Sequence, residues 1–204
     1  MKRKYIILLI ILALPLLDVF YACCNCDIIT DEKFYINTGF NLKNIDNSGA
    51  EPLESASVNI NKKAFGIRLQ VNRQSLAFLK KQINQPLFSS SAYAMSCECD
   101  PEVTYGPKDV IEDVKIIALN SFNADKPAES EITEYFRYSK DYSEISKIIQ
   151  KLNHEFAYQL KDTEYFDLLL MVPPSETNIQ HQFKVVITFE NKQPVELITT
   201  VNLI

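Results

Sequence analysis

Apolar and polar positions alternate along most of the chain, and this period of two is typical of half-buried β-strands. A first strand is predicted at residues 34–43, with its inner positions at Phe34, Ile36, Thr38, Phe40 and Leu42. A second is predicted at residues 64–71, and its inward side chains are Phe65, Ile67, Leu69 and Val71. Arg68 and Gln70 alternate with those positions, so we expect them to face water.

The rest of the pattern predicts further strands and one long helix. Strands are expected at residues 110–119 and 166–172, and residues 183–189 and 195–203 form a closing hairpin around the turn at 191–194. A helix is predicted to begin near Asp141, with Glu144 in a capping-box-like position. Its apolar face contains Ile145, Ile148, Ile149, Leu152, Phe156 and Leu160. A shorter helix is predicted at residues 75–83.

These elements predict a mainly β fold, namely an antiparallel immunoglobulin-like β-sandwich with one inserted α-helix. Clean alternation argues against a parallel sheet, whose strands are buried on both faces and are apolar almost throughout. The length beyond the N-terminal segment suits a single domain with a real core. We therefore expect one β-sandwich domain at residues 33–204.

The N-terminus has the layout of a secretory signal peptide. Three basic residues at positions 2–4 precede an apolar run from Ile6 to Leu17, which is too short to span a bilayer as a stable helix. Asp18 ends this run, and cleavage is predicted after the small residue Ala22, so that residues 1–22 are the signal peptide. Residues 23–32 would then form a tether whose first residue is Cys23.

Cys23 lies where the lipobox of bacterial lipoproteins places the cysteine that receives the lipid. Ala22 fits such a box, whereas Phe20 stands where it usually has leucine, so an ordinary signal peptide without lipid is the alternative. Lipidation with acyl chains such as palmitate would anchor the protein to the cell envelope. The predicted location is the outer membrane, facing either the periplasm or the surface.

Five cysteines are an awkward number for an exported protein, because one thiol stays unpaired. If Cys23 carries lipid, four remain, at Cys24, Cys26, Cys97 and Cys99. We expect at least one disulfide between the first pair and the second, because disulfides persist in an oxidising compartment. The alternatives are a four-thiolate site for zinc or Cu(I), and free thiols.

Charge and motifs argue against several chemistries. After cleavage the chain has 18 basic and 25 acidic residues, a balance opposite to that of nucleic-acid-binding proteins. Four glycines form no phosphate-binding loop, and no hydrolase motif is present. His154 and His181 lack ligand-spaced partners and are interpreted as surface residues. Acidic residues that lack calcium-loop spacing are Asp100, Glu102, Asp109, Glu112 and Asp113. We expect no catalytic residue, cofactor or metal.

Several stretches resemble a group of small uncharacterised Bacteroidetes lipoproteins. They are Ala64-Phe65-Gly66-Ile67-Arg68-Leu69, Ser91-Ala92-Tyr93-Ala94-Met95-Ser96-Cys97, Ile111-Glu112-Asp113-Val114-Lys115-Ile116 before Asn120-Ser121-Phe122, Tyr165-Phe166-Asp167-Leu168-Leu169-Leu170 before Pro173-Pro174, and His181-Gln182-Phe183. The resemblance implies export, a lipid anchor and a β-rich domain. It implies no catalytic or binding residue.

The predicted function is that of an exported, lipid-anchored envelope protein with a non-enzymatic binding or structural role. Its expected partners are the membrane, through the lipid, and a protein or a glycan. The alternative is a small hydrolase or glycan-binding protein that acts on envelope or environmental polysaccharide. Aromatic residues before the helix, Tyr135, Phe136, Tyr138 and Tyr142, could stack on sugars, but packing is the favoured interpretation, and the chain has no tryptophan.

Overall fold

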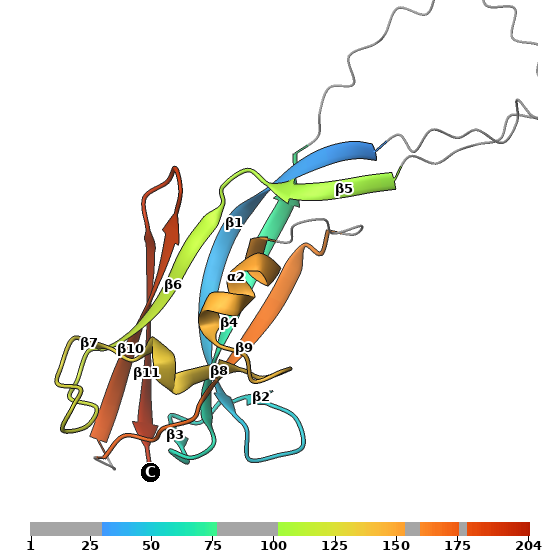
Figure 1. The fold of residues 1–204 in the computed structure, drawn as a ribbon. Helices are drawn as coiled ribbons and strands as arrows, with labels where there is room; N and C mark the ends of the chain where they lie inside the picture. The colour runs from blue at the N-terminus through green and yellow to red at the C-terminus, as the bar shows by residue number, and fades with distance from the viewer. Residues whose placement is uncertain (1–29, 77–101, 154–159, 176–178) are drawn as a thin grey trace, which may run out of the picture. The chain divides into compact units, whose positions relative to one another are not determined.

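The structure is a computed structural model that describes residues 30–76, 102–153, 160–175 and 179–204. The chain divides into two compact units, residues 1–32 with 78–104 and residues 33–77 with 105–204. The described part of the second unit contains the core of the fold. It is mainly β, with two sheets and one α-helix among the described residues (Figure 1).

Each sheet combines strands from distant parts of the chain. Sheet A has the order β2 (Leu53–Glu54), β1 (Thr30–Asp46), β4 (Phe65–Ser75), β9 (Thr163–Leu170) and β8 (Phe136–Tyr138), and β5 (Glu102–Pro107) also pairs with β1. Sheet B has the order β3 (Asn59–Ile60), β11 (Val195–Leu203), β10 (Ile179–Phe189), β6 (Ile111–Ala118) and β7 (Ser130–Glu131). The long neighbours β1–β4, β4–β9, β10–β11 and β6–β10 are antiparallel, whereas the short β3 pairs with β11 in parallel.

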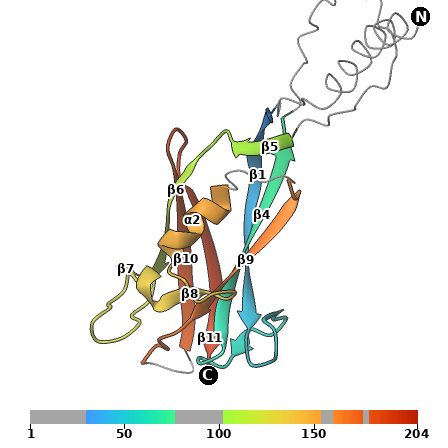
Figure 2. The same ribbon diagram turned by 45° about the vertical axis from the view of Figure 1, so that its right-hand side comes forward.

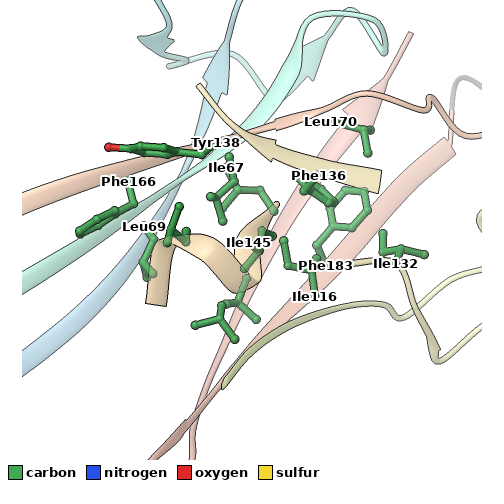
Figure 3. Packing of buried hydrophobic residues seen from close by; sticks show 14 of the residues in the cluster. Ile67, Leu69, Ile116, Ile132, Phe136, Tyr138, Ile145, Phe166, Leu170 and Phe183 are labelled. Carbon is green, nitrogen blue, oxygen red and sulfur yellow. The ribbon is translucent and has the colours of Figure 1, made fainter. Parts of the chain in front are cut away.

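The core lies between the two sheets. The rings of Phe65 on β4 and Phe183 on β10 stack with centroids 5.2 Å apart. Figure 3 shows how residues of β4, β8, β9, β10 and β6 converge with Ile145 of the helix. The predicted inner positions of β4 and of the closing hairpin are confirmed for Phe65, Ile67, Leu69, Val71, Phe183, Val185, Ile187 and Phe189, all of which are buried.

The first strand departs from the predicted alternation. Tyr35 and Asn37, which were expected to face outward, are buried, whereas Phe40 and Leu42 pack against the core as predicted. The register with β4 shifts between Asn37 and Gly39, which is the signature of a β-bulge. An extra residue in one strand reverses which side chains point inward, so the prediction is wrong before the bulge and right after it.

Helix α2 (Ile145–Asn153) lies between the sheets and packs against β6 and β8 (Figure 2). Its buried apolar residues are Ile145, Ile148 and Leu152. The helix begins later than the predicted start at Asp141, because that carboxylate accepts a hydrogen bond from the Ser143 N–H within a turn (3.0 Å). Residues 154–159 lie outside the described part, so the predicted continuation through Phe156 is untested there, whereas Leu160, the last predicted position of the helix face, is not helical.

A second helix is predicted at residues 75–83, but the first residue of this range is the last residue of β4. Ser75 is the last residue of β4 and still pairs with Tyr35, so it belongs to a strand. Residues 77–83 lie outside the described residues. The strand continues to Ser75 because Arg73 and the two residues after it pair with β1. The apolar pattern at 76–83 gives no information about that pairing.

The beginning and the end of the domain are joined by the side chain of Asn44 on β1. Its amide nitrogen donates to the Thr200 carbonyl (2.8 Å), and its amide oxygen accepts from the Thr199 hydroxyl (2.7 Å). Both partners belong to β11 of sheet B. One residue therefore ties the first strand of sheet A to the last strand of the chain.

Candidate functional site

The residues predicted to carry lipid or disulfides lie outside the described part of the chain. These are Cys23, Cys24, Cys26, Cys97 and Cys99. Lipidation and disulfide formation therefore stay predictions. In the described ranges, no helix has both the length and the hydropathy needed to cross a membrane.

The predicted surface position of His181 is wrong. His181 is 1 % exposed, and its ring stacks on Phe183 with centroids 6.2 Å apart. Phe122 meets the same imidazole edge-on at 6.5 Å. His181 and Phe183 share the inner side of β10, so the period-two rule that buries the phenylalanine also buries the histidine. His154 lies outside the described residues.

The aromatic residues before the helix are largely packing residues, as favoured. Phe136 and Tyr138 are buried, Tyr135 packs against the core, and Tyr142 is exposed. No group of three or more His, Cys, Asp or Glu side chains that could hold a metal occurs among the residues that the structure describes.

A buried polar network lies on the inner side of sheet A. The Arg73 guanidinium is ion-paired with Glu164, and its second terminal nitrogen donates to the Leu152 carbonyl (2.7 Å) at the end of helix α2. The Tyr35 ring lies 5.4 Å from the guanidinium carbon, and its hydroxyl donates to the Asn153 carbonyl. These two donors therefore bind the carbonyls of Leu152 and Asn153, the last two residues of helix α2 that the structure describes.

Asn153 extends this network to sheet B. Its side-chain amide donates to the Ile111 carbonyl (2.9 Å) and accepts from the Ile111 N–H (2.8 Å), as a neighbouring strand would. Asn153 is 3 % exposed. The hydrogen bonds of this network go largely to backbone groups of the protein itself, so the network holds the helix between the sheets.

The outer side of sheet A carries a different polar set. Register places Asn41, Gln70 and Tyr165 in one cross-strand row of β1, β4 and β9. The next row contains Gly39, Asn72 and Thr163. Side chains directly opposite on neighbouring strands share one face. We call Asn41, Gln70, Asn72, Thr163 and Tyr165 the amide face.

Hydrogen bonds within the amide face fix its side chains and leave specific groups free. The Asn72 side-chain oxygen accepts from the Gln70 amide nitrogen and from the Thr163 hydroxyl, both at 3.1 Å. In the described part of the chain, the Asn72 amide nitrogen and the Gln70 amide oxygen then have no partner. A free donor and a free acceptor are thus held side by side.

Tyr165 adds an aromatic surface beside these amides. Its side chain is 47 % exposed, and the Arg68 guanidinium carbon lies 5.5 Å from the ring centroid. Gly39, opposite Asn72, contributes no side chain, and a Cβ there would lie 3.6 Å from the Asn72 amide nitrogen. The Asn72 donor is therefore approachable from the side of β1.

Ion pairs border the amide face in the next cross-strand row of the same three strands. Arg68 makes a two-point contact with the Asp167 carboxylate (2.6 and 2.8 Å), and this hydrogen bonding raises the pKa of the guanidinium. Glu54 lies 3.5 Å from Arg68 and 2.6 Å from Lys43, whose hydrogen bond lowers the pKa of the Glu54 carboxyl group. The charges in this row are compensated, while the two central rows contain no charged side chain.

Sequence reasoning missed the amide face as a unit. It placed Arg68 and Gln70 on the water side, and the buried neighbours of Asn72 and Tyr165 could have indicated the same for those two residues. Cross-strand register was missing, because no local pattern says which residue of β9 lies beside Gln70. The signal that could have helped is that both segments have polar or aromatic residues at every second position, at 68, 70 and 72 in one and at 163, 165 and 167 in the other.

The fold and its surface define a mainly β domain with two packed sheets, a polar outer face and one helix between the sheets. A family model described as a domain of unknown function (DUF5034) matches residues 37–200, and the chain belongs to this family. Comparison with curated proteins finds no match, and neither does comparison with solved structures.

Proposed function

We propose that this is an exported, lipid-anchored envelope protein whose role is binding rather than catalysis, and that the amide face is its binding surface. The observation that carries the binding role is the pair of fixed, unpartnered amide groups at Asn72 and Gln70 beside the exposed ring of Tyr165. Groups that are already ordered lose little conformational freedom when a ligand binds, so this arrangement favours recognition.

The contrast with the buried polar network supports a binding role over catalysis. There, the potential acid–base groups Glu164 and Tyr35 are engaged with Arg73 and with the Asn153 carbonyl. On the amide face, the central side chains are amides, a hydroxyl and a phenol, and the nearest carboxylate of the bordering row, Asp167, is held by Arg68. The two carboxylates that lie near each other in the bordering row, Glu54 and Asp167, are both paired with Arg68, whereas glycoside hydrolysis uses two carboxyl groups that act on the substrate.

A screen of the purified mature protein tests the binding role. Envelope glycans and envelope proteins are presented to the wild-type chain and to two variants, Asn72→Asp on the amide face and Tyr142→Ala, an exposed tyrosine elsewhere. We expect at least one ligand that the Tyr142→Ala variant keeps and the Asn72→Asp variant loses. If every ligand bound the Asn72→Asp variant as tightly as it binds the wild type, this placement of the binding surface would be contradicted.

Anchoring by Cys23 rests on the sequence of the N-terminal segment: basic residues, a short apolar run, and a cysteine after Ala22. One acyl chain gives only marginal membrane binding, so stable anchoring requires more than one. The intact mass of the mature protein from membranes should begin at Cys23 and include lipid. A different N-terminus without lipid mass would contradict anchoring by Cys23.

A disulfide between Cys24 or Cys26 and Cys97 or Cys99 is the second covalent proposal. Its support is topological: β1 begins at Thr30, shortly after Cys26, β5 begins at Glu102, shortly after Cys99, and these two strands pair. The loop-entropy model gives about 4 kcal/mol for a closure of this length. Peptide mapping with and without reduction should find the bridge. Four thiols that alkylate without reduction would contradict it, and bound zinc or copper would then favour the thiolate site.

The finer fold and family assignments are also proposals. An immunoglobulin-like arrangement is supported by two packed sheets whose long strands are antiparallel. The kinship to Bacteroidetes lipoproteins is supported by the sequence stretches that run through the family match. An experimental structure of the mature chain would test the first, and the intact mass of the lipidated protein bears on the second.

A further inference from the structure

We infer that the ligand of the amide face is an uncharged carbohydrate chain, bound with one sugar ring on Tyr165 and adjacent hydroxyl groups on Asn72 and Gln70. This inference rests on the proposed binding role of the amide face and names the class of its ligand. The argument uses the charge of the face, the donor and acceptor it offers, and its shape.

Charge is the first part of the argument. The two central rows of the face contain only uncharged side chains, and the charges of the bordering row are paired among Lys43, Glu54, Arg68 and Asp167. A charged ligand would lose its hydration without gaining an opposite charge, which is costly. An uncharged ligand meets no such penalty, so the face favours neutral polymers over uronic or sulfated ones.

Hydrogen bonding is the second part. The free Asn72 amide nitrogen is a donor, and the free Gln70 amide oxygen is an acceptor. A hydroxyl group both donates and accepts, so two neighbouring hydroxyls of a sugar ring can satisfy both amides at once. The orientation of each amide is set by its contact with the other and with Thr163, so these groups are already positioned before binding.

Shape is the third part. Neighbouring strands lie about 4.8 Å apart and alternate side chains along a strand about 7 Å apart, so the two rows form a shallow surface on the scale of a few sugar rings. Tyr165 offers its exposed ring next to Gln70, and aromatic rings pack against the apolar C–H faces of sugars. The missing side chain at Gly39 leaves room beside Asn72 for a chain that continues past β1.

The test is calorimetric titration of the purified full-length mature protein with three uncharged oligosaccharides, maltohexaose, mannohexaose and xylohexaose, and with hexagalacturonate. We expect binding of at least one uncharged oligosaccharide and none of hexagalacturonate. Binding of hexagalacturonate alone, or of none of the four, would overturn the inference. In that case, loss of some other ligand in the Asn72→Asp variant would still uphold the proposed binding role, so the two failures are distinguishable.

Three variants locate the binding. Tyr165→Ala should weaken it about tenfold, whereas Tyr165→Phe should keep most of it, because the ring remains. Asn72→Asp keeps the oxygen that accepts from Gln70 and Thr163 but loses the free donor, so it should also weaken binding about tenfold. Tyr142→Ala is the control and should bind as the wild type does. Equal affinity of all variants would overturn the inference, and circular dichroism excludes unfolding as the cause of a loss.

Discussion

Sheet A carries polar residues on both of its faces, and the two sets differ in what their hydrogen bonds reach. On the inner face, Arg73 and Tyr35 donate to the last carbonyls of helix α2, and their polar groups are enclosed by the protein. On the outer face, Asn72 and Gln70 bond to each other and still keep a free donor and a free acceptor. The comparison teaches that polarity alone does not distinguish the two faces, and the proposed binding role of the outer face is supported by fixed groups that are both free and partly exposed to solvent.

The largest expected effect is a difference in the free energy of unfolding between substitutions of two arginines on the same strand, β4. Arg73→Met should lower the free energy of unfolding by about 3 kcal/mol, because it removes a buried ion pair with Glu164 and the donor to the Leu152 carbonyl. Arg68→Met, on the outer face, should cost roughly half as much, because water can solvate Asp167. Urea denaturation of both variants measures this difference. Equal losses would show that enclosure is not what distinguishes the two faces.

The next effect concerns the link to sheet B. Asn153→Ala should cost about 2 kcal/mol, because both backbone groups of Ile111 lose their partner at a buried position. Asn72→Ala on the outer face is the matched control, and water replaces its bonds, so we expect a loss below about 1 kcal/mol. Urea denaturation of both variants measures the two losses in the free energy of unfolding. A smaller loss for Asn153→Ala than for Asn72→Ala would contradict the structural role of the inner network.

A smaller effect is expected for the exposed ring. Tyr165→Ala should change the free energy of unfolding by less than about 1 kcal/mol, because it removes a surface contact with Arg68 and little buried area. Thermal unfolding monitored by circular dichroism measures it. A loss comparable to that of Arg73→Met would indicate that Tyr165 serves the fold, and the outer face would then resemble the inner one.

The smallest effect is a pH dependence at the surface. The Lys151 ammonium, 2.6 Å from Asp141, lowers the pKa of that carboxyl group below its ordinary value of 3.8. The ionised form is therefore favoured by folding, and its stabilisation is present above pH 3.8 and is lost as the pH falls through the lowered pKa. Asp141→Asn should be less stable than wild type at neutral pH, and the difference should shrink in acid.

Urea midpoints at neutral pH and below pH 3.8 measure that difference. The control is the same substitution in a Lys151→Gln background, where the Asp141 carboxylate keeps only its hydrogen bonds with Ser143, so the pH dependence should be smaller. A difference between Asp141→Asn and wild type that stays constant with pH would contradict the assignment to this ion pair.

Much of the fold could be predicted, because buried apolar residues alternate with more exposed residues along most of β4 and the closing hairpin. The bulge near Asn37 could not, since an inserted residue changes which side faces inward without any change in composition. The amide face could be predicted only in part. The outward direction of Gln70 follows from local alternation, but its proximity to Tyr165 depends on which residue of β9 pairs with it.

The contact between Asn44 and Thr200 has a consequence for the order in which the protein can be made. Asn44 belongs to the first strand and Thr200 to the last, and 156 positions separate them in sequence. Sheet B also draws two of its three long strands, β10 and β11, from the final part of the chain. A ribosome that has synthesised most of this protein therefore still holds a chain in which sheet B lacks two of its three long strands. For an exported protein, as we propose, sheet B can be completed only after the last strand has been synthesised.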